Sequence, residues 1–106
     1  MARQLIIAKA FAEDLSTIAR IFGESDRTDL PHIAGVTHRS LFHLGDVYAH
    51  LVETDGAGAV ERARHHPEFA RVSKELEPFV APYLATWRGP QDALATCFYE
   101  WNAVAP

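Results

Sequence analysis

The chain has 106 residues, of which 48% are hydrophobic and 23% charged, and its formal net charge is −4. This length suits one domain, residues 1–106, since domains mostly hold about 100–150 residues, and the composition is that of a globular protein. The negative charge argues against a nucleic-acid-binding protein, and no apolar run approaches the roughly 20 residues that span a bilayer. A single cysteine, Cys97, allows no internal disulfide, so we expect a cytoplasmic protein.

The first quarter of the chain predicts a strand and then an amphipathic helix. Gln4–Phe11 is a short apolar run, which favours a strand. From Glu13 onward, apolar residues recur at helical spacing and would bury one face, namely Leu15, Ile18, Ala19 and Phe22. We expect this helix to end between residues 23 and 26, and the polar segment Asp26–Pro31 to be a connection.

Two strands, Val36–Leu44 and Val47–Thr54, are predicted to form a hairpin around Gly45-Asp46, because a two-residue turn needs positive φ angles. Since side chains alternate along a strand, this turn places one set on a shared face: Thr37, Arg39, Leu41, His43, Tyr48, His50 and Val52. The other face carries small apolar residues. We therefore expect the apolar face to lie under the helices and the polar face to turn away from them.

The second half of the chain predicts helices interrupted by prolines and then a last strand. Residues 59–65 have a helical pattern, and a further helix should begin at Pro67, because proline suits the first helical position. Pro78 and Pro82 should kink or break that helix. The aromatic-rich segment Leu94–Trp101 favours the last strand.

These elements follow the order strand, helix, strand, strand, helix, strand. That order is typical of the ferredoxin-like α+β fold, a four-stranded antiparallel sheet with both helices on one face. The second face of such a sheet would be bare and apolar in water. A homodimer is the simplest way to cover it.

The hairpin also carries the clearest candidates for chemistry. Arg39 and His50 are diagonal neighbours in the expected register, roughly 7–8 Å apart at the backbone. A histidine can transfer protons near neutral pH, and an arginine can stabilise an oxyanion or enolate. With the Tyr48 hydroxyl they would suit enolisation, aldol closure or dehydration. The alternative is structural, with Arg39 bound to a carboxylate and His50 at a subunit interface.

The other groups of residues give weaker indications of a functional site. The six histidines show no paired ligand spacing, so we expect no metal. Cys97 has no evident base nearby, which favours a packing role. The sequence has no glycine-rich phosphate loop and no serine nucleophile elbow. Four aromatic residues could stack on a flat aromatic ligand, although core packing is the commoner role: Trp87, Phe98, Tyr99 and Trp101.

Several different short motifs follow one another along the whole chain. They are Phe22–Pro31 followed by Gly35-Val36, Arg39-x-Leu41-Phe42, Asp46-x-Tyr48-x-His50-Leu51, His66-Pro67-x-Phe69, Ala81-Pro82-Tyr83 with Trp87, and Phe98-Tyr99-x-Trp101. Together they resemble the tetracenomycin-type aromatic polyketide cyclases. The resemblance implies a homodimer of the dimeric α+β barrel type that directs aldol ring closure and dehydration of a poly-β-ketone, with no cofactor.

The resemblance also implies site residues. An aspartate after the first helix, an arginine on the second strand and a histidine on the third fall on Asp26, Arg39 and His50. In this interpretation His50 moves the proton, Arg39 steadies the enolate oxygen and Asp26 orients or anchors. We expect the substrate-binding residues to include Tyr48, Ser25, His43, Trp101 and Phe98. Ser25 stands where the family often has a histidine, and a serine cannot replace it as a general acid or base.

Two other functions stay open at this point. Dimeric ferredoxin-like proteins also include cofactor-free oxygenases, here acting on a polyphenol, and fold analogy alone does not separate the two. A non-catalytic chaperone that folds the polyketide is the third hypothesis. The expected partners are a polyketide substrate, a second copy of the chain and polyketide synthase components, with no nucleic acid and no membrane.

Overall fold

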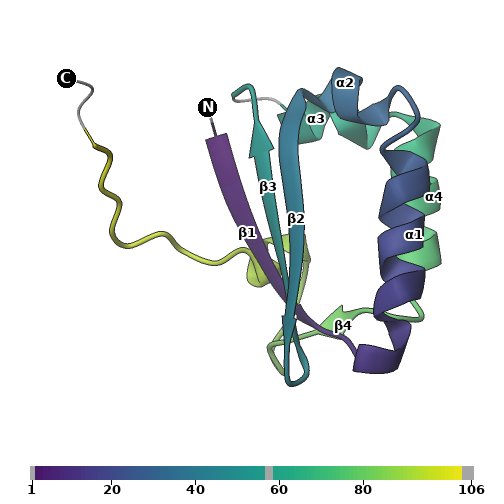
Figure 1. Cartoon of the computed structure of the whole chain (residues 1–106), viewed down its shortest axis with the longest axis vertical. Helices are drawn as coiled ribbons and strands as arrows, with labels where there is room; N and C mark the ends of the chain where they lie inside the picture. Colours follow the sequence, from purple (N-terminus) through teal and green to yellow (C-terminus); the bar gives the residue numbers. More distant parts are fainter. Residues whose placement is uncertain (1, 57–58, 104–106) are drawn as a thin grey trace.

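A four-stranded antiparallel sheet with the strand order β2-β3-β1-β4 carries the helices on one face (Figure 1). The computed structural model describes residues 2–56 and 59–103. Its elements are β1 (Ala2–Lys9), the 3₁₀ helix η1 (Ala12–Asp14), α1 (Leu15–Ser25), α2 (Leu30–Ala34), β2 (Val36–Leu44), β3 (Val47–Thr54), α3 (Ala59–Arg64), α4 (Pro67–Leu76), β4 (Ala81–Pro82) and the 3₁₀ helix η2 (Pro90–Ala93). The ferredoxin-like prediction is confirmed.

The β2–β3 hairpin has the predicted bounds and register. Leu44 pairs with Val47, and further out Leu41 pairs with His50 and Arg39 with Val52. Gly45 adopts a positive φ of 63° at the turn, which glycine tolerates because it has no Cβ. The register predicted from the turn residues is therefore confirmed.

The orientation of the hairpin was predicted wrongly. Along β3 the buried side chains are Tyr48, His50, Val52 and Thr54, and the ring of Phe22 from α1 packs edge-on against His50 at 5.1 Å between centroids. The face with Arg39, Tyr48 and His50 thus lies under the helices. Large rings fill the space beneath a helix better than Ala49 does, and the polar groups there bind one another.

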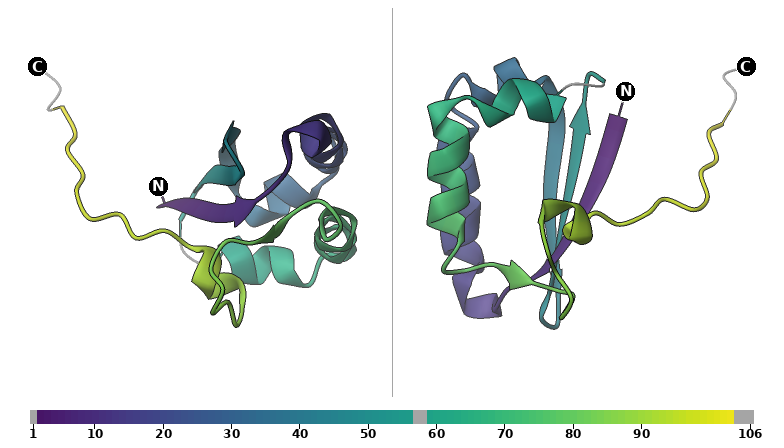
Figure 2. Two further views of the ribbon diagram at one scale, coloured as in Figure 1. Left: turned by 90° about the horizontal axis from the view of Figure 1, so that it is seen from below. Right: turned by 180° about the vertical axis from the view of Figure 1, so that it is seen from behind.

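Helices α1 and α4 lie side by side over this inner face (Figure 2). The main core cluster joins α1, α4 and the sheet: Ala8, Ala10, Ile18, Ile21, Phe22, Tyr48 and Val72. His66 caps α4, its Nδ1 accepting from the Glu68 N–H, and α4 ends at Leu76, just before Pro78. The predicted start and interruption of this helix are both confirmed.

The segment predicted as a connection, Asp26–Pro31, leads instead into the short helix α2. Arg62 of α3 holds the end of α2, donating to the carbonyls of Ile33 at 2.9 Å and Ala34 at 3.2 Å and to Asp55 Oδ1 at 2.7 Å. The two contacts with α2 join residues 29 and 28 positions apart, so local sequence gave no sign of them. They fix α2 across one end of the molecule.

The predicted last strand, Leu94–Trp101, is also wrong. The fourth strand is the two-residue β4, which pairs with β1 at Ala8 and Lys9, while Leu94 makes only one bridge, to Ile6. Two short segments therefore share the β1 edge, and among the described residues no longer strand pairs with it. Beyond Leu94 the described chain extends away from the body of the molecule (Figure 1).

The other face of the sheet, which we call the outer face, is uncovered in the single chain and carries several large apolar side chains. Phe42 is 57% exposed and Leu44 83% exposed, and Leu5 of β1 adds to the same face. Among the described residues, no helix is long and apolar enough to cross a membrane.

Candidate functional site

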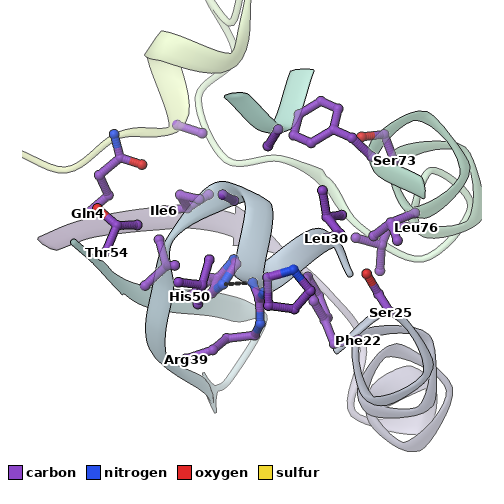
Figure 3. A pocket seen from close by; sticks show the side chains of 18 of the residues that line it. Gln4, Ile6, Phe22, Ser25, Leu30, Arg39, His50, Thr54, Ser73 and Leu76 are labelled. Atoms are coloured by element: carbon purple, nitrogen blue, oxygen red, sulfur yellow. Dashed lines mark hydrogen bonds between the residues drawn. The ribbon is translucent and has the colours of Figure 1, made fainter. Parts of the chain in front are cut away.

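A cavity of about 440 Å³ lies between the inner face of the sheet and the helices (Figure 3). That volume is in the range of small-molecule sites. Most of its wall is apolar, with Ile6 and Val52 from the sheet, Phe22 from α1, Leu30 from α2, and Phe69 and Leu76 from α4. The polar side chains on the wall are few: Gln4, Ser25, Arg39, His50, Thr54, Ser73 and Gln91.

Arg39 is the organising group of this wall. Its Nε donates to Asp26 Oδ2 at 3.1 Å and its Nη2 to Oδ1 at 2.9 Å, a two-point contact that fixes the plane of the guanidinium. The guanidinium also lies over the Phe22 ring, 5.1 Å from the centroid. The Arg39 side chain is only 17% exposed, so a cation is held at the edge of an apolar cavity.

His50 completes the group. Its Nε2 lies 3.0 Å from Arg39 Nη1. Because a guanidinium has no acceptor, Nε2 must accept this hydrogen bond, which assigns the ring proton to Nδ1 and makes the imidazole neutral. Burial, and then the charge of Arg39, lower the pKa of His50 to about 4, against an opposing effect of Asp26. At neutral pH the group is therefore a base whose lone pair is engaged by Arg39.

The structure thus brings together the three residues predicted as catalytic, Asp26, Arg39 and His50. Ser25, the last residue of α1, is 3% exposed, and its side chain lies on the cavity wall beside them. Among the described residues, no three histidine, cysteine, aspartate or glutamate side chains gather so that they could hold a metal ion.

The other residues predicted to bind substrate lie elsewhere. Tyr48 is buried in the core, off the cavity wall, with its ring 6.4 Å from the His50 ring, and burial raises the pKa of its phenol despite the opposing charge of Arg39. His43 donates from Nε2 to the Ala10 carbonyl at 2.8 Å. Phe98 and Trp101 are 95% and 72% exposed on the segment that leaves the body.

Sequence reasoning missed several residues on the wall. Gln4, Thr54, Ser73 and Gln91 were not predicted, and Phe69 and Leu76 were interpreted only as helix packing. Gln4 did carry a signal. It is the polar member of the alternating set Gln4, Ile6 and Ala8 on the inner side of β1, where an apolar residue is the usual choice.

The fold and this wall define a class of protein: a small ferredoxin-like α+β domain with an apolar small-molecule cavity and one buried arginine–histidine pair. The chain belongs to the polyketide synthesis cyclase family, whose pattern matches residues 2–102. The resemblance seen in the motifs is thereby confirmed.

Individual relatives agree with this assignment. The chain is 50% identical to the uncharacterised protein SCO5314 of Streptomyces coelicolor, with 96% of both chains covered. It is 45% identical to the polyketide synthase protein CurG of Streptomyces cyaneus, over 96% of this chain and 98% of that one. It is 36% identical to tetracenomycin F2 cyclase of Streptomyces glaucescens, over 95% and 94%. The solved structure of that type-II polyketide cyclase superposes with a TM-score of 0.89, covering 98% of this chain and 100% of that one.

Proposed function

We propose that this cyclase directs intramolecular aldol cyclisation and dehydration of a poly-β-ketone, so that an aromatic ring forms. The observation that carries the proposal is the Arg39–His50 contact at the wall of the apolar cavity. It sets a fixed cation and a neutral base side by side where a carbonyl oxygen and its neighbouring C–H would lie. Ring closure in such a chain needs these two groups and no redox step.

The proton transfer would begin at His50 Nε2. A substrate carbonyl oxygen takes over the hydrogen bond from Arg39 Nη1, which frees the Nε2 lone pair. The C–H bond between two carbonyls then breaks, its proton passes to Nε2, and its electrons form the enolate that Arg39 stabilises. The negative enolate also offsets the Arg39 charge, which is one of the causes that lower the pKa of His50. The histidine thus becomes a stronger base as the reaction proceeds.

The carbon–carbon bond then forms within the same chain. The enolate carbon attacks a second carbonyl carbon, the resulting alkoxide takes the proton back from His50, and loss of the hydroxyl with a neighbouring proton releases water. Both partners are held in one cavity, and intramolecular orientation can contribute several kcal/mol to such a step. The apolar wall therefore contributes to the reaction by holding the two reacting carbons together.

Asp26 acts through Arg39. It lies off the cavity wall and is 38% exposed, and both its carboxylate oxygens are engaged by the guanidinium. In this proposal Asp26 is a positioning residue that keeps Nη1 aimed at the cavity.

The test is a reconstitution with a polyketide synthase that supplies the poly-β-ketone, with products separated by chromatography. Arg39→Met, His50→Gln and the double variant should each lose most of the directed ring closure and yield spontaneous products. Arg20→Met is the matched control, because Arg20 lies on the exposed side of α1 and pairs with Glu24. A double variant that forms the same product at the same rate would refute the proposed roles. Oxygen uptake during turnover would indicate the oxygenase instead, and altered product ratios without turnover by the isolated protein would indicate the chaperone.

We further propose that a second copy of the chain covers the outer face, with polyketide synthase components delivering the substrate. The support for a dimer is the exposure of the large apolar side chains of Leu5, Phe42 and Leu44 on the same sheet face. Light scattering should give twice the chain mass for the wild type and the single mass for Leu44→Asp. A wild type that is monomeric at high concentration would contradict the dimer.

A further inference from the structure

We propose that Gln4 is a specificity-determining residue that binds a neutral oxygen of the substrate at the end of the cavity away from Arg39. This inference rests on the proposed function, since it concerns how the same cavity holds a poly-β-ketone. Its basis is a polar side chain on the part of the wall that lies across Val52 from Arg39.

The sheet register places Gln4 opposite the reacting pair. Arg39 of β2 and Gln4 of β1 both pair with Val52 of β3, so the three residues form one row across the inner face. Neighbouring strands lie about 4.8 Å apart, which separates the backbones of Arg39 and Gln4 by roughly 10 Å. Figure 3 shows Gln4 at one side of the cavity and the Arg39–His50 pair at another. Val52 lies between them as the floor.

The side chain of Gln4 is available to a ligand. Gln4 is half-buried and lies on the cavity wall, and no other side chain or backbone group within residues 2–56 and 59–103 forms a hydrogen bond with its amide. Among the described residues no buried side-chain nitrogen or oxygen lacks a hydrogen-bond partner, so the Gln4 amide still reaches solvent, and a ligand oxygen would take the place of water there. The amide is therefore able to bind a substrate oxygen.

The amide also defines the chemistry of that oxygen. It offers two N–H donors and one carbonyl acceptor, so it suits a ketone, an enol or a phenol equally. It carries no charge to match an anion. These three groups are the forms that each oxygen of a poly-β-ketone takes before and after aromatisation.

Two polar groups at a fixed distance can set the position of the substrate along the cavity, which apolar contacts alone cannot do. Oxygens recur on alternate carbons of the substrate, so the chain could slide by one repeat and still present a carbonyl to Arg39. A second hydrogen bond at a fixed span penalises the shifted placements, because their oxygens no longer meet both groups. Gln4 would thus select which carbons are joined, while Arg39 and His50 join them.

Binding of inert probes tests Gln4 without any turnover. In 2,6-dihydroxyanthraquinone one hydroxyl lies at each end, whereas 2-hydroxyanthraquinone can satisfy only one end. By calorimetry, Gln4→Met should weaken binding of the first probe about 5- to 10-fold and of the second less than about twofold, the effect of one lost hydrogen bond. Gln91→Met is the matched control, since it removes an amide from another residue that lines the cavity.

The outcomes separate this inference from the proposed function. Equal effects of Gln4→Met on both probes, or the selective effect appearing in Gln91→Met instead, would overturn the role of Gln4 whether or not the protein turns over. In the reconstitution, Gln4→Met should broaden the ring-closure products while Arg39→Met lowers their total. An unchanged product pattern would also overturn it. Gln4→Glu keeps the shape of the side chain and replaces the amide donors, so it serves as the second variant if Gln4→Met fails to fold.

Discussion

The two faces of one sheet show how differently neighbouring residues can be used. Along β3, Tyr48, His50 and Val52 are buried under the helices, while Val47, Ala49 and Leu51 between them are only partly covered on the outer face. The more polar set is therefore the more deeply buried one. Size and mutual hydrogen bonding decided burial here, because a buried arginine and histidine satisfy each other and fill the space that small residues would leave empty.

The largest effect expected from this contrast is on stability. Phe22→Ala removes a side chain that packs on both His50 and Arg39, and should lower the free energy of unfolding by about 3–5 kcal/mol. The same change on the outer face, Phe42→Ala, should cost less than about 1 kcal/mol at chain concentrations low enough to dissociate the proposed dimer, since surface substitutions mostly do. Urea unfolding of both variants measures the difference. Equal losses would mean that the outer face is as buried in solution as the inner one.

The next effect is on the pH dependence of stability. The pKa of His50 is lowered from about 6.5 to about 4, so between these values the unfolded chain binds more protons than the folded one. Stability should therefore be full above pH 6.5 and fall by about 3 kcal/mol as the pH drops to 4. His50→Gln should flatten this part of the curve. His38→Gln changes a histidine on the exposed side of β2 and should leave the pH dependence of stability unchanged. If that variant flattened the curve instead, the pH dependence would not come from His50.

A smaller effect, on the reaction rate, is expected from changing Asp26, which holds the Arg39 guanidinium. Asp26→Asn keeps the shape but weakens both hydrogen bonds to the guanidinium, and should lower kcat about tenfold, as expected for the loss of a charged contact of this kind. KM should change little, because the carboxylate does not line the cavity. Asp29→Asn, at an exposed position before α2, is the control. A rise in KM with kcat unchanged would show that Asp26 touches the substrate.

The sequence predicted which side chains share the inner face of the sheet, but not that the helices cover this face. Gly45-Asp46 sufficed to align Arg39 with Val52 and Leu41 with His50, because turn geometry and alternation are local rules. Those rules tell which side chains share a face, but not which face the helices cover. That choice depends on how Phe22 packs against His50, a contact between residues far apart in the chain.

The other differences between prediction and structure depend on contacts between segments far apart in the chain. Leu94–Trp101 has the composition of a strand, but β4 already occupies the β1 edge at Ala8 and Lys9. Asp26 was placed in the site only through the family motif, since nothing local pairs it with Arg39. Gln4 was overlooked because it begins an apolar run, and although its place in the alternating set on β1 is unusual, only the cavity shows what it faces.

The shared β1 edge also bears on aggregation. Exposed strand edges recruit other strands, and a long, flat edge is a template for uncontrolled sheet growth. On one side of this sheet the β1 edge is covered at Ala8 and Lys9 by β4, in which Pro82 has no N–H to offer, and at Ile6 by the bridge to Leu94. On the other side, the pairing of β2 is interrupted between Val36 and His38. Both edges are thus poor templates, and an orderly assembly of this cyclase would form by stacking sheet faces rather than by adding strands.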